Sequence, residues 1–120
     1  MPEIKISEYA ADSDSEIKVL VIEGSVDAYN SEILSNKLDD VVKKDFIKII
    51  IDCSKLNFIS SSGMGVFLAM EDELTEKGGG FKFISVPDTI LNVFKKVGIS
   101  EIFKIYPNEN SAVEDFKKGI

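Results

Sequence analysis

Apolar residues follow two spacings along this chain, one typical of buried strands and one typical of amphipathic helices. Runs rich in β-branched residues occupy Ile17–Glu23 and Phe46–Asp52, and a third apolar run occupies Phe81–Val86. Such runs indicate strands that are covered on both faces. The segment Glu3–Glu8 instead alternates apolar and polar residues, which predicts a half-exposed edge strand. A last short strand is expected at Ile102–Tyr106.

Four helices are expected between and after these strands. The first begins near Asn30, and the others span Ser62–Lys77, Pro87–Val97 and Glu109–Lys118. Apolar residues at helical spacing predict which face of each helix is buried. For the first three helices these residues are Ile33, Leu34, Leu38, Val41 and Val42; Val66, Phe67, Met70 and Leu74; and Ile90, Leu91, Phe94 and Val97.

Turn residues divide these elements and suggest how they are connected. Ala10–Glu16 is a polar turn, Gly24 is expected to break a strand, and glycines at 78–80 and at Gly98 end two helices. Strands that alternate with helices imply a mostly parallel sheet, whereas a short turn implies antiparallel pairing of the first two strands. The sequence therefore predicts one α/β domain over residues 1–120, with a parallel central sheet, an antiparallel N-terminal edge strand and about four helices.

Composition narrows the classes of function. Hydrophobic residues make up 44% of the 120 positions and charged residues 29%, a balance typical of globular proteins. The net charge of −7 argues against binding to nucleic acid or to anionic membranes. The chain contains no histidine, which excludes Ser-His-Asp and Cys-His catalysis and imidazole metal sites. No metal or cofactor is expected, and proteins or small molecules are the expected partners.

The expected compartment is the cytoplasm. No apolar run approaches the roughly 20 residues of a membrane-spanning helix, and the N-terminus lacks the basic start and apolar centre of a signal peptide. The single cysteine, Cys53, fits a reducing compartment. Because it follows an apolar run, it is expected to be a buried structural thiol.

A run of serines and glycines, Ser60–Gly65, is the most informative segment. It opens a predicted helix, where backbone N–H groups and the helix dipole favour an anion. Ser62 or Ser61 could simply cap the helix, an interaction worth about 1 kcal/mol. However, one serine suffices for a cap, and Gly63 and Gly65 each cost on the order of 1 kcal/mol in a helix relative to alanine. The residues alone leave capping and a functional site evenly balanced.

Asp27 is the second candidate for a functional position. Sites in open α/β sheets gather at the carboxyl ends of the strands, and Asp27 and Ser60 each follow a strand end. If the two strands are neighbours, both residues lie on one edge of the sheet. Asp27 could contact a partner there or cap the first helix. Asp52 is expected to be a local hydrogen-bond acceptor, and Ile59 and Met64, beside the serines, could serve either the core or an interface.

Two segments of this chain resemble the signature of bacterial anti-sigma factor antagonists, the STAS domain family. In that signature a strand ends in Asp, a short loop carries an aromatic residue, and Asp-Ser-Ser/Thr-Gly-Leu-Gly follows. Here the strand ends at Asp52, the loop contains Phe58, and the motif reads Ser60-Ser61-Ser62-Gly63-Met64-Gly65. The segment Gly24–Asp27 also resembles the family's Gly-x-Leu-Asp. Length and element order fit over nearly the whole chain.

The resemblance implies a regulatory cycle rather than catalysis. The unphosphorylated protein would bind an anti-sigma factor that is a serine kinase and so release the sigma factor, and a serine phosphatase would reverse the phosphorylation. Ser61 maps to the phosphoacceptor and Ser62 to the hydroxyl residue that follows it, whereas Ser60 replaces the motif's Asp. Ser60 and Ser62 are alternative acceptors. The implied partner-binding residues are Asp27, Ser60, Ser61, Ser62, Gly63, Met64 and Gly65.

Other functions are compatible with the same fold. The domain could be an unphosphorylated STAS scaffold, a transporter-associated subunit or a nucleotide-binding sensor, and weak nucleotide binding stays open. An enzyme with a serine nucleophile is disfavoured, because only a Ser-Lys pair remains without histidine and no lysine is suitably spaced.

Overall fold

The computed structural model describes residues 4–118, so the predicted start of the first strand at residue 3 lies outside the described residues. Six strands, four α-helices and one 3₁₀ turn follow one another along this part of the chain. In order they are β1 (Ile4–Ala11), β2 (Asp14–Val26), α1 (Ser31–Lys43), β3 (Lys48–Asp52), β4 (Leu56–Ile59), α2 (Ser61–Glu76), β5 (Gly80–Ile84), α3 (Asp88–Lys96), η1 (Ile99–Glu101), β6 (Lys104–Tyr106) and α4 (Glu109–Lys118).

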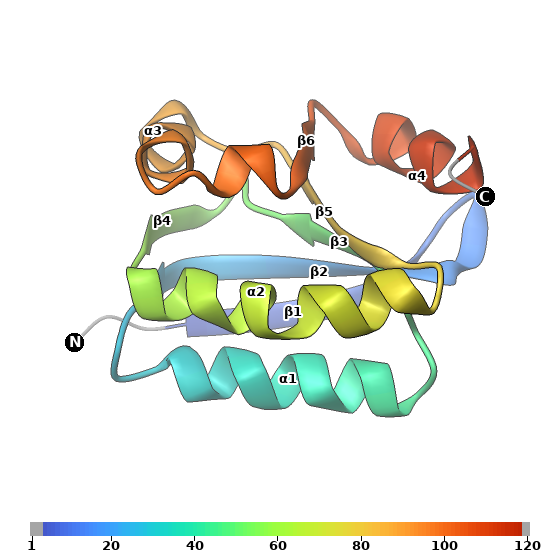
Figure 1. Cartoon of the computed structure of the whole chain (residues 1–120), viewed down its shortest axis with the longest axis horizontal. Helices are drawn as coiled ribbons and strands as arrows, with labels where there is room; N and C mark the ends of the chain where they lie inside the picture. The colour runs from blue at the N-terminus through green and yellow to red at the C-terminus, as the bar shows by residue number, and fades with distance from the viewer. Residues whose placement is uncertain (1–3, 119–120) are drawn as a thin grey trace.

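The strands form one mixed sheet in the order β1-β2-β3-β5-β6 (Figure 1). β1 pairs antiparallel with β2, and β2, β3, β5 and β6 pair parallel. Helices connect the parallel strands β2, β3 and β5, as a parallel arrangement requires. The predicted fold class is therefore confirmed. The connection between β1 and β2 is shorter than the predicted turn, because both strands extend into it and only residues 12–13 turn.

The prediction of a loop between Asp52 and the serines was wrong. Residues 56–59 form β4, which pairs with the last part of β2 beyond the segment that pairs with β3. Gly24 does not end β2; it adopts a φ of 97° at a register shift, and its N–H donates to the Lys55 carbonyl at 3.0 Å. Glycine tolerates this backbone conformation at little cost. One long strand can therefore pair with β3 and then with β4.

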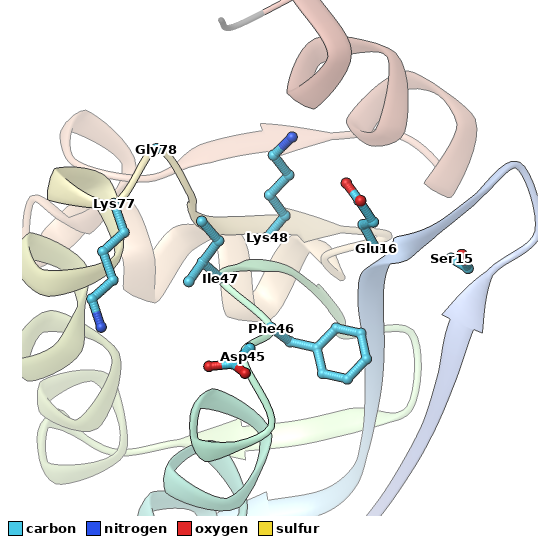
Figure 2. A pocket seen from close by; sticks show the side chains of 8 residues that line it. All are labelled: Ser15, Glu16, Asp45, Phe46, Ile47, Lys48, Lys77 and Gly78. Carbon is cyan, nitrogen blue, oxygen red and sulfur yellow. The ribbon is translucent and has the colours of Figure 1, made fainter.

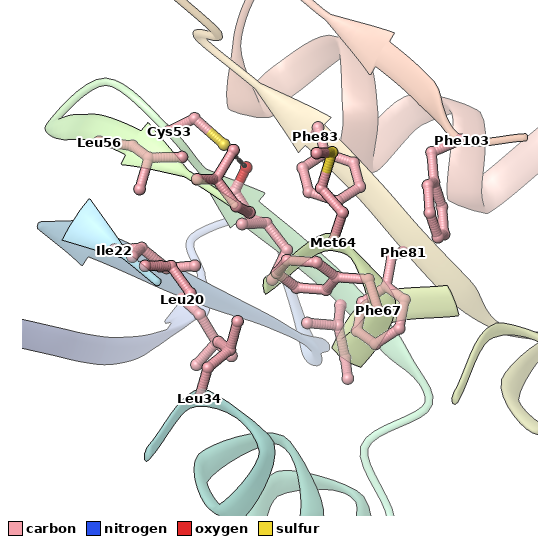
Figure 3. Close-up of a cluster of buried hydrophobic side chains, with 14 of the residues drawn as sticks. Leu20, Ile22, Leu34, Cys53, Leu56, Met64, Phe67, Phe81, Phe83 and Phe103 are labelled. Carbon is pink, nitrogen blue, oxygen red and sulfur yellow. Dashed lines mark hydrogen bonds between the residues drawn. The ribbon is translucent and has the colours of Figure 1, made fainter. Parts of the chain in front are cut away.

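The core lies on both faces of the sheet, because successive strand residues point to opposite sides. On one face, residues of α1, α2 and α3 pack against the sheet, and on the other α4 covers Ile17, Val19, Ile50 and Ile84. Figure 1 shows α1 and α2 side by side on one side, with α4 on the other. Five phenylalanines of the larger cluster make edge-to-face contacts with one another: Phe67, Phe81, Phe83, Phe94 and Phe103. Figure 3 labels four of them, Phe67, Phe81, Phe83 and Phe103.

The predicted burial of Cys53 agrees with the structure, whereas the predicted burial of Ile33 and Val97 does not. Cys53 is fully buried, and burial together with the neighbouring Asp52 raises the pKa of its thiol, which confirms the predicted structural role. Ile33 and Val97, predicted to face inward, are instead 53% and 52% exposed. Val97 follows the last residue of α3, where Gly98 turns the chain into the left-handed region and η1 begins. Helical periodicity no longer determines the direction of a side chain there.

The start of α2 packs closely against the ends of β2 and β4. A Cβ atom on Gly63 would lie 2.6 Å from Cγ1 of Val26 and 2.9 Å from Cγ1 of Ile59. By contrast, a Cβ atom on Gly65 would meet nothing within 4 Å. Packing within the domain thus accounts for the glycine at position 63 but does not account for the glycine at position 65.

The helix α4 is tied to the sheet by one carboxylate. Asp115 accepts a hydrogen bond from Tyr106 and forms ion pairs with Lys82 at 2.7 Å and Lys104 at 3.7 Å. Lys82 and Tyr106 hold the pKa of Asp115 at about 2, below its ordinary 3.8. The charged form of Asp115 therefore stabilises the contact between α4 and β5–β6.

Replacing Gly63 and Gly65 of α2 by alanine should change the free energy of unfolding in opposite directions. Gly63→Ala should lower the free energy of unfolding by about 1–3 kcal/mol, because the added methyl overpacks against Val26 and Ile59. Gly65→Ala should raise it by up to about 1 kcal/mol, because alanine favours helix and has open space. Urea unfolding of both variants measures this; equal effects would contradict the packing assignment.

The Asp115 contact should depend on pH in a defined direction. Because the folded-state pKa lies below the unfolded one, the stabilisation is complete above about pH 4 and disappears as the pH falls through about 2. Wild type should therefore unfold at a higher temperature than Asp115→Asn at pH 5, and the difference should vanish towards pH 2. Thermal unfolding followed by circular dichroism measures it; a constant difference would refute the pKa shift.

Candidate functional site

The predicted functional residues meet at one edge of the sheet. Val26 and Ile59, the last residues of β2 and β4, are paired across the two strands, and the Ser60 N–H donates to the Val26 carbonyl at 2.8 Å. Asp27 and Ser60 therefore leave adjacent strands side by side, as the sequence predicted for neighbouring strands. The strand that pairs with the end of β2 and precedes the serines is β4, not β3.

Ser60, not Ser61 or Ser62, caps α2. Its backbone is extended, and its Oγ accepts a hydrogen bond from the Gly63 N–H at 3.2 Å. The sequence offered Ser62 or Ser61 as the possible cap, because it placed the helix start one residue too late. Ser61 and Ser62 are exposed, and their hydroxyls have no hydrogen-bond partner within residues 4–118. The capping requirement is thus met, and two hydroxyls remain accessible.

The first turn of α2 carries no acidic side chain. Glu32, Asp88 and Glu109 occupy the first turns of α1, α3 and α4, where they complement the positive end of each helix dipole. In α2 the corresponding positions hold serine and glycine. The partial positive charge at the start of α2 therefore has no carboxylate in its own first turn, beside the exposed Ser61.

Asp27 is held in a rigid turn together with Asn30. Its Oδ1 accepts hydrogen bonds from the N–H groups of Tyr29 and Asn30, at 2.9 and 3.0 Å. The buried Asn30 side chain returns a bond, accepting from the Asp27 N–H at 2.8 Å and donating to the Ser25 carbonyl at 2.9 Å. Asn30 occupies the cap position of α1, but its side chain bonds backwards to the turn. The half-buried Asp27 carboxylate is fixed at the edge of the sheet.

The other candidate positions differ in how accessible they are. Gly63 and Met64 are buried, whereas Gly65 is half-buried beside open space. Ile59 is also buried, so it serves the core. Asp52 accepts from the Ser54 N–H at 2.9 Å, as expected of a local hydrogen-bond acceptor. Of the predicted partner-binding residues, only Ser61 and Ser62 are exposed.

An apolar groove that the sequence pattern did not predict lies beside Ser61. The α2–α3 groove, of about 150 Å³, is lined by Ser61, Met64, Leu68, Val97, Ile99 and Ile102. Helical spacing predicted Val97 to be buried, and Ile102 was expected inside a strand, so neither was recognised as a surface residue. Two more large side chains are exposed: Tyr29 at 96%, two residues after Asp27, and Phe58 at 50%, two residues before Ser60.

A larger hollow, of about 730 Å³, lies at the opposite end of α2 (Figure 2). A helix of 16 residues spans about 24 Å, so Ser61 and the hollow are well separated. The charges in the hollow are mixed: two carboxylates, of Glu16 and Asp45, and two lysines, Lys48 and Lys77. No one sign of charge dominates, so the hollow offers no distinct anion or cation site.

Within residues 4–118, no group of three or more His, Cys, Asp or Glu side chains is placed to hold a metal ion. None of the helices in this part of the chain is both long and apolar enough to cross a membrane.

Comparisons with known proteins agree with this fold. The curated anti-sigma F factor antagonist of Paenibacillus polymyxa is 24% identical over 102 residues, or 84% of this chain and 87% of that protein. The solved structure of the unphosphorylated anti-sigma factor antagonist SpoIIAA matches with a TM-score of 0.76 at 21% identity, covering 97% of this chain and 98% of that one. The Bacillus cell fate determinant SpoIIAA in its phosphorylated form gives 0.66 at 22% identity, over 92% and 97%.

At these identities the solved structures show a shared fold. The family assignment rests on the sequence, because the model of the STAS domain matches residues 8–112, from within β1 to within α4. That range includes both segments at the edge of the sheet, Asp27 with its turn and the serines at the start of α2. The chain belongs to the STAS domain family.

Proposed function

We propose that this protein is an anti-sigma factor antagonist that works by partner switching. Its unphosphorylated form binds an anti-sigma factor, which is a serine kinase, and thereby releases a sigma factor. The kinase phosphorylates Ser61 and ends the complex, and a serine phosphatase restores the binding form. The protein is the substrate of this chemistry and not an enzyme. Its curated relative in Paenibacillus polymyxa, an anti-sigma F factor antagonist, supports the assignment.

The observation that carries the proposal is the division of roles between Ser60 and Ser61. Ser60 already satisfies the start of α2 through its bond to the Gly63 N–H. Ser61 is exposed and is not needed for the cap, so a kinase can reach its hydroxyl without disturbing the helix. Ser60 is half-buried and its oxygen accepts that bond, which makes it the poorer acceptor. Ser62 is exposed like Ser61, and only the resemblance to the family favours Ser61 over it.

A phosphate on Ser61 would be tolerated by the fold but not by an interface. It adds about −1.5 to −2 charges, which the start of a helix stabilises by about 0.3–1 kcal/mol. Burying the same dianion against a partner without a matching charge costs several kcal/mol. At about 1.4 kcal/mol per tenfold change, the affinity would fall on the order of a thousandfold. One modified hydroxyl thus controls binding while the domain stays folded.

The serine at position 60 makes the start of α2 less acidic than the family motif. The motif has Asp beside the acceptor, whereas Ser60 keeps the capping bond without adding a charge. No carboxylate in the first turn of α2 then repels the phosphate. We expect the phosphorylated form of this protein to be at least as stable as the unphosphorylated form.

Removing the Ser60 hydroxyl should lower stability more than removing the Ser61 hydroxyl. Ser60→Ala should lower the free energy of unfolding by about 1 kcal/mol, because the Gly63 N–H loses its partner. Ser61→Ala should change it by less than about 0.5 kcal/mol, since the exposed hydroxyl makes no bond within the described residues. Urea unfolding of the two variants measures this. A larger loss of stability in Ser61→Ala than in Ser60→Ala would show that Ser60 is not the cap.

Phosphorylation should depend on Ser61. After incubation of wild type with ATP and each anti-sigma kinase of the host, intact-mass and peptide mass spectrometry should find one phosphate on Ser61. Ser61→Ala should gain none and should keep its complex with the kinase on native electrophoresis. Ser62→Ala is the matched control and should be phosphorylated like wild type.

The alternatives give different results in the same experiment. A phosphate that persists in Ser61→Ala would move the acceptor to Ser60 or Ser62. A complex without phosphate would indicate an unphosphorylated antagonist or scaffold. Neither complex nor phosphate would contradict the proposed function and favour another STAS role, as a transporter-associated subunit or a nucleotide sensor, which titration with GTP and ATP would then test.

A further inference from the structure

The strand β6 leaves one edge of the sheet open. It is the last strand in the order β1-β2-β3-β5-β6, and within residues 4–118 no further strand pairs with its outer side. Figure 1 shows β6 at the margin of the sheet, with α3 to its left and α4 to its right. Edge strands present unpaired backbone N–H and C=O groups, which can pair with a strand from another chain. An extended segment can therefore be added to the sheet beside β6.

The backbone groups of Ile105 point away from the sheet. The Tyr106 carbonyl accepts a hydrogen bond from the Ser85 N–H at 3.3 Å, so the backbone groups of Tyr106 face β5. Successive residues of a strand turn their backbone N–H and C=O groups to opposite sides. Lys104 and Tyr106 therefore pair with β5, and Ile105 presents its N–H and its C=O to the open edge. These two groups are available to an added strand.

A hollow of about 690 Å³ lies beside this edge. This β6 hollow is lined by Leu91 and Lys95 of α3 and by residues 100–106. Ile102, which is 55% exposed, gives it an apolar surface together with the half-buried Leu91 and Ile105. No residue of α2 lines the β6 hollow, so it is separate from the serines. An added strand would find both backbone partners and apolar surface there.

The two faces of the sheet differ in chemistry at β6. The Ile105 side chain packs against the cluster under α1, α2 and α3, whereas Tyr106 packs against the cluster under α4. Lys104, two residues before Tyr106, points to the α4 face as well, where its Nζ lies 3.7 Å from the Asp115 carboxylate. The Lys104 side chain is still 71% exposed, because Asp115 already pairs with Lys82 at 2.7 Å. A strand beside β6 would therefore meet apolar side chains on the α3 face and an ammonium group on the α4 face.

The charge around the β6 hollow favours an acidic occupant. Two lysines, Lys95 and Lys104, line the hollow against one carboxylate, that of Glu101. Lys95 is exposed and forms no ion pair within residues 4–118. This local excess of positive charge is opposite in sign to the net charge of −7. The lysines attract an acidic segment over about 10 Å at 0.1 M salt, whereas the net charge disfavours a second copy of the chain.

We propose that β6 binds an extended segment of a partner protein as an additional strand, and that this segment alternates apolar and acidic side chains. Its backbone pairs with the N–H and C=O of Ile105. Its apolar side chains point to the α3 face and cover Ile102, and its acidic side chains point to the α4 face beside Lys104. The alternation follows because successive side chains of a strand point to opposite faces, and opposite charges on neighbouring strands attract. Binding at β6 does not depend on Ser61.

A synthetic peptide of four Val-Glu repeats with blocked ends is a direct probe of this site. NMR titration of the isotope-labelled full chain should show saturable binding, with the largest shift changes at residues 104–106 and slowed hydrogen exchange of the Ile105 N–H. A Val-Lys peptide reverses the charge, and a peptide of Val-Val-Glu-Glu repeats keeps the composition without the alternation. Both should bind about tenfold more weakly or less. No saturable binding of the Val-Glu peptide up to about 1 mM would overturn the proposal.

Strand pairing can be separated from attraction between charges. The N–H groups of alternate residues in a strand point to the same edge, so methylating the nitrogens of either all valines or all glutamates blocks one edge of the peptide. The two methylated peptides have equal charge and equal numbers of methyl groups. One should lose binding and the other should keep it, because only one edge pairs with Ile105. Equal binding of the two peptides would contradict strand addition.

Variants of the protein test which lysine meets the acidic side chains. Lys104→Glu should weaken binding of the Val-Glu peptide about fivefold or more, and the loss should shrink as the salt concentration rises. Lys5→Glu is the matched control and should bind within about twofold of wild type, because Lys5 is also exposed on an edge strand but lies on β1. Ser61→Glu should bind like wild type, since no residue of α2 lines the hollow. Thermal unfolding should show that all three variants are folded.

Three other outcomes would overturn the assignment of β6. Equal losses in Lys104→Glu and Lys5→Glu would indicate a general charge effect, and shift changes along β1 would place the peptide at the other edge of the sheet. A loss of binding in Ser61→Glu would place it at the start of α2. If light scattering shows wild type associating with itself, and Lys104→Glu abolishes this where Lys5→Glu does not, the edge belongs to a second copy. None of these outcomes depends on a kinase, so the proposed function stands or fails separately.

Discussion

The pairing of the last residues of β2 with β4 is the constraint on which the candidate site depends. It places Val26 opposite Ile59 and is closed by the 2.8 Å bond from the Ser60 N–H to the Val26 carbonyl. Gly63 then lets the first turn of α2 lie directly on these two side chains. Without this pairing, Asp27 and the serines would be on separate segments. With it, they share one rigid edge, and the start of α2 has a fixed direction.

This rigidity explains how a small chemical change could act as a switch. The capping bond from Gly63 to Ser60 holds the helix start independently of Ser61. The turn at Asp27 is held by its own reciprocal bonds with Asn30. Because the surroundings are fixed by groups other than the Ser61 hydroxyl, a phosphate added to that hydroxyl would change the local charge without disturbing the fold. In the proposed function, the fold stays unchanged and the exposed Ser61 carries the regulation.

The two glycines of α2 illustrate how sequence motifs combine structural and functional demands. Gly63 is required by close packing inside the domain, so its presence says nothing about a partner. Gly65 has open space around the position of a side chain, so internal packing does not account for it. The sequence treated the two alike, as costly residues at a helix start that capping does not explain. Only the neighbours of each Cβ position distinguish them.

The sequence by itself determined the α/β class, the four helices and the helix ends near Gly78 and Gly98. Periodicity and turn residues act over a few residues and are visible without the fold. It also singled out Asp27 and the serines as candidate positions, because strand ends and serine-glycine runs are local features. Tertiary structure alone decided that residues 56–59 form a strand, that Ser60 rather than Ser61 is the cap, and that Val97 and Ile102 border a groove. Each of these depends on contacts between distant segments: β2 with β4 past the shift at Gly24, and α2 with the turn after α3. Such contacts depend on register and packing across the sheet, which a local pattern does not encode.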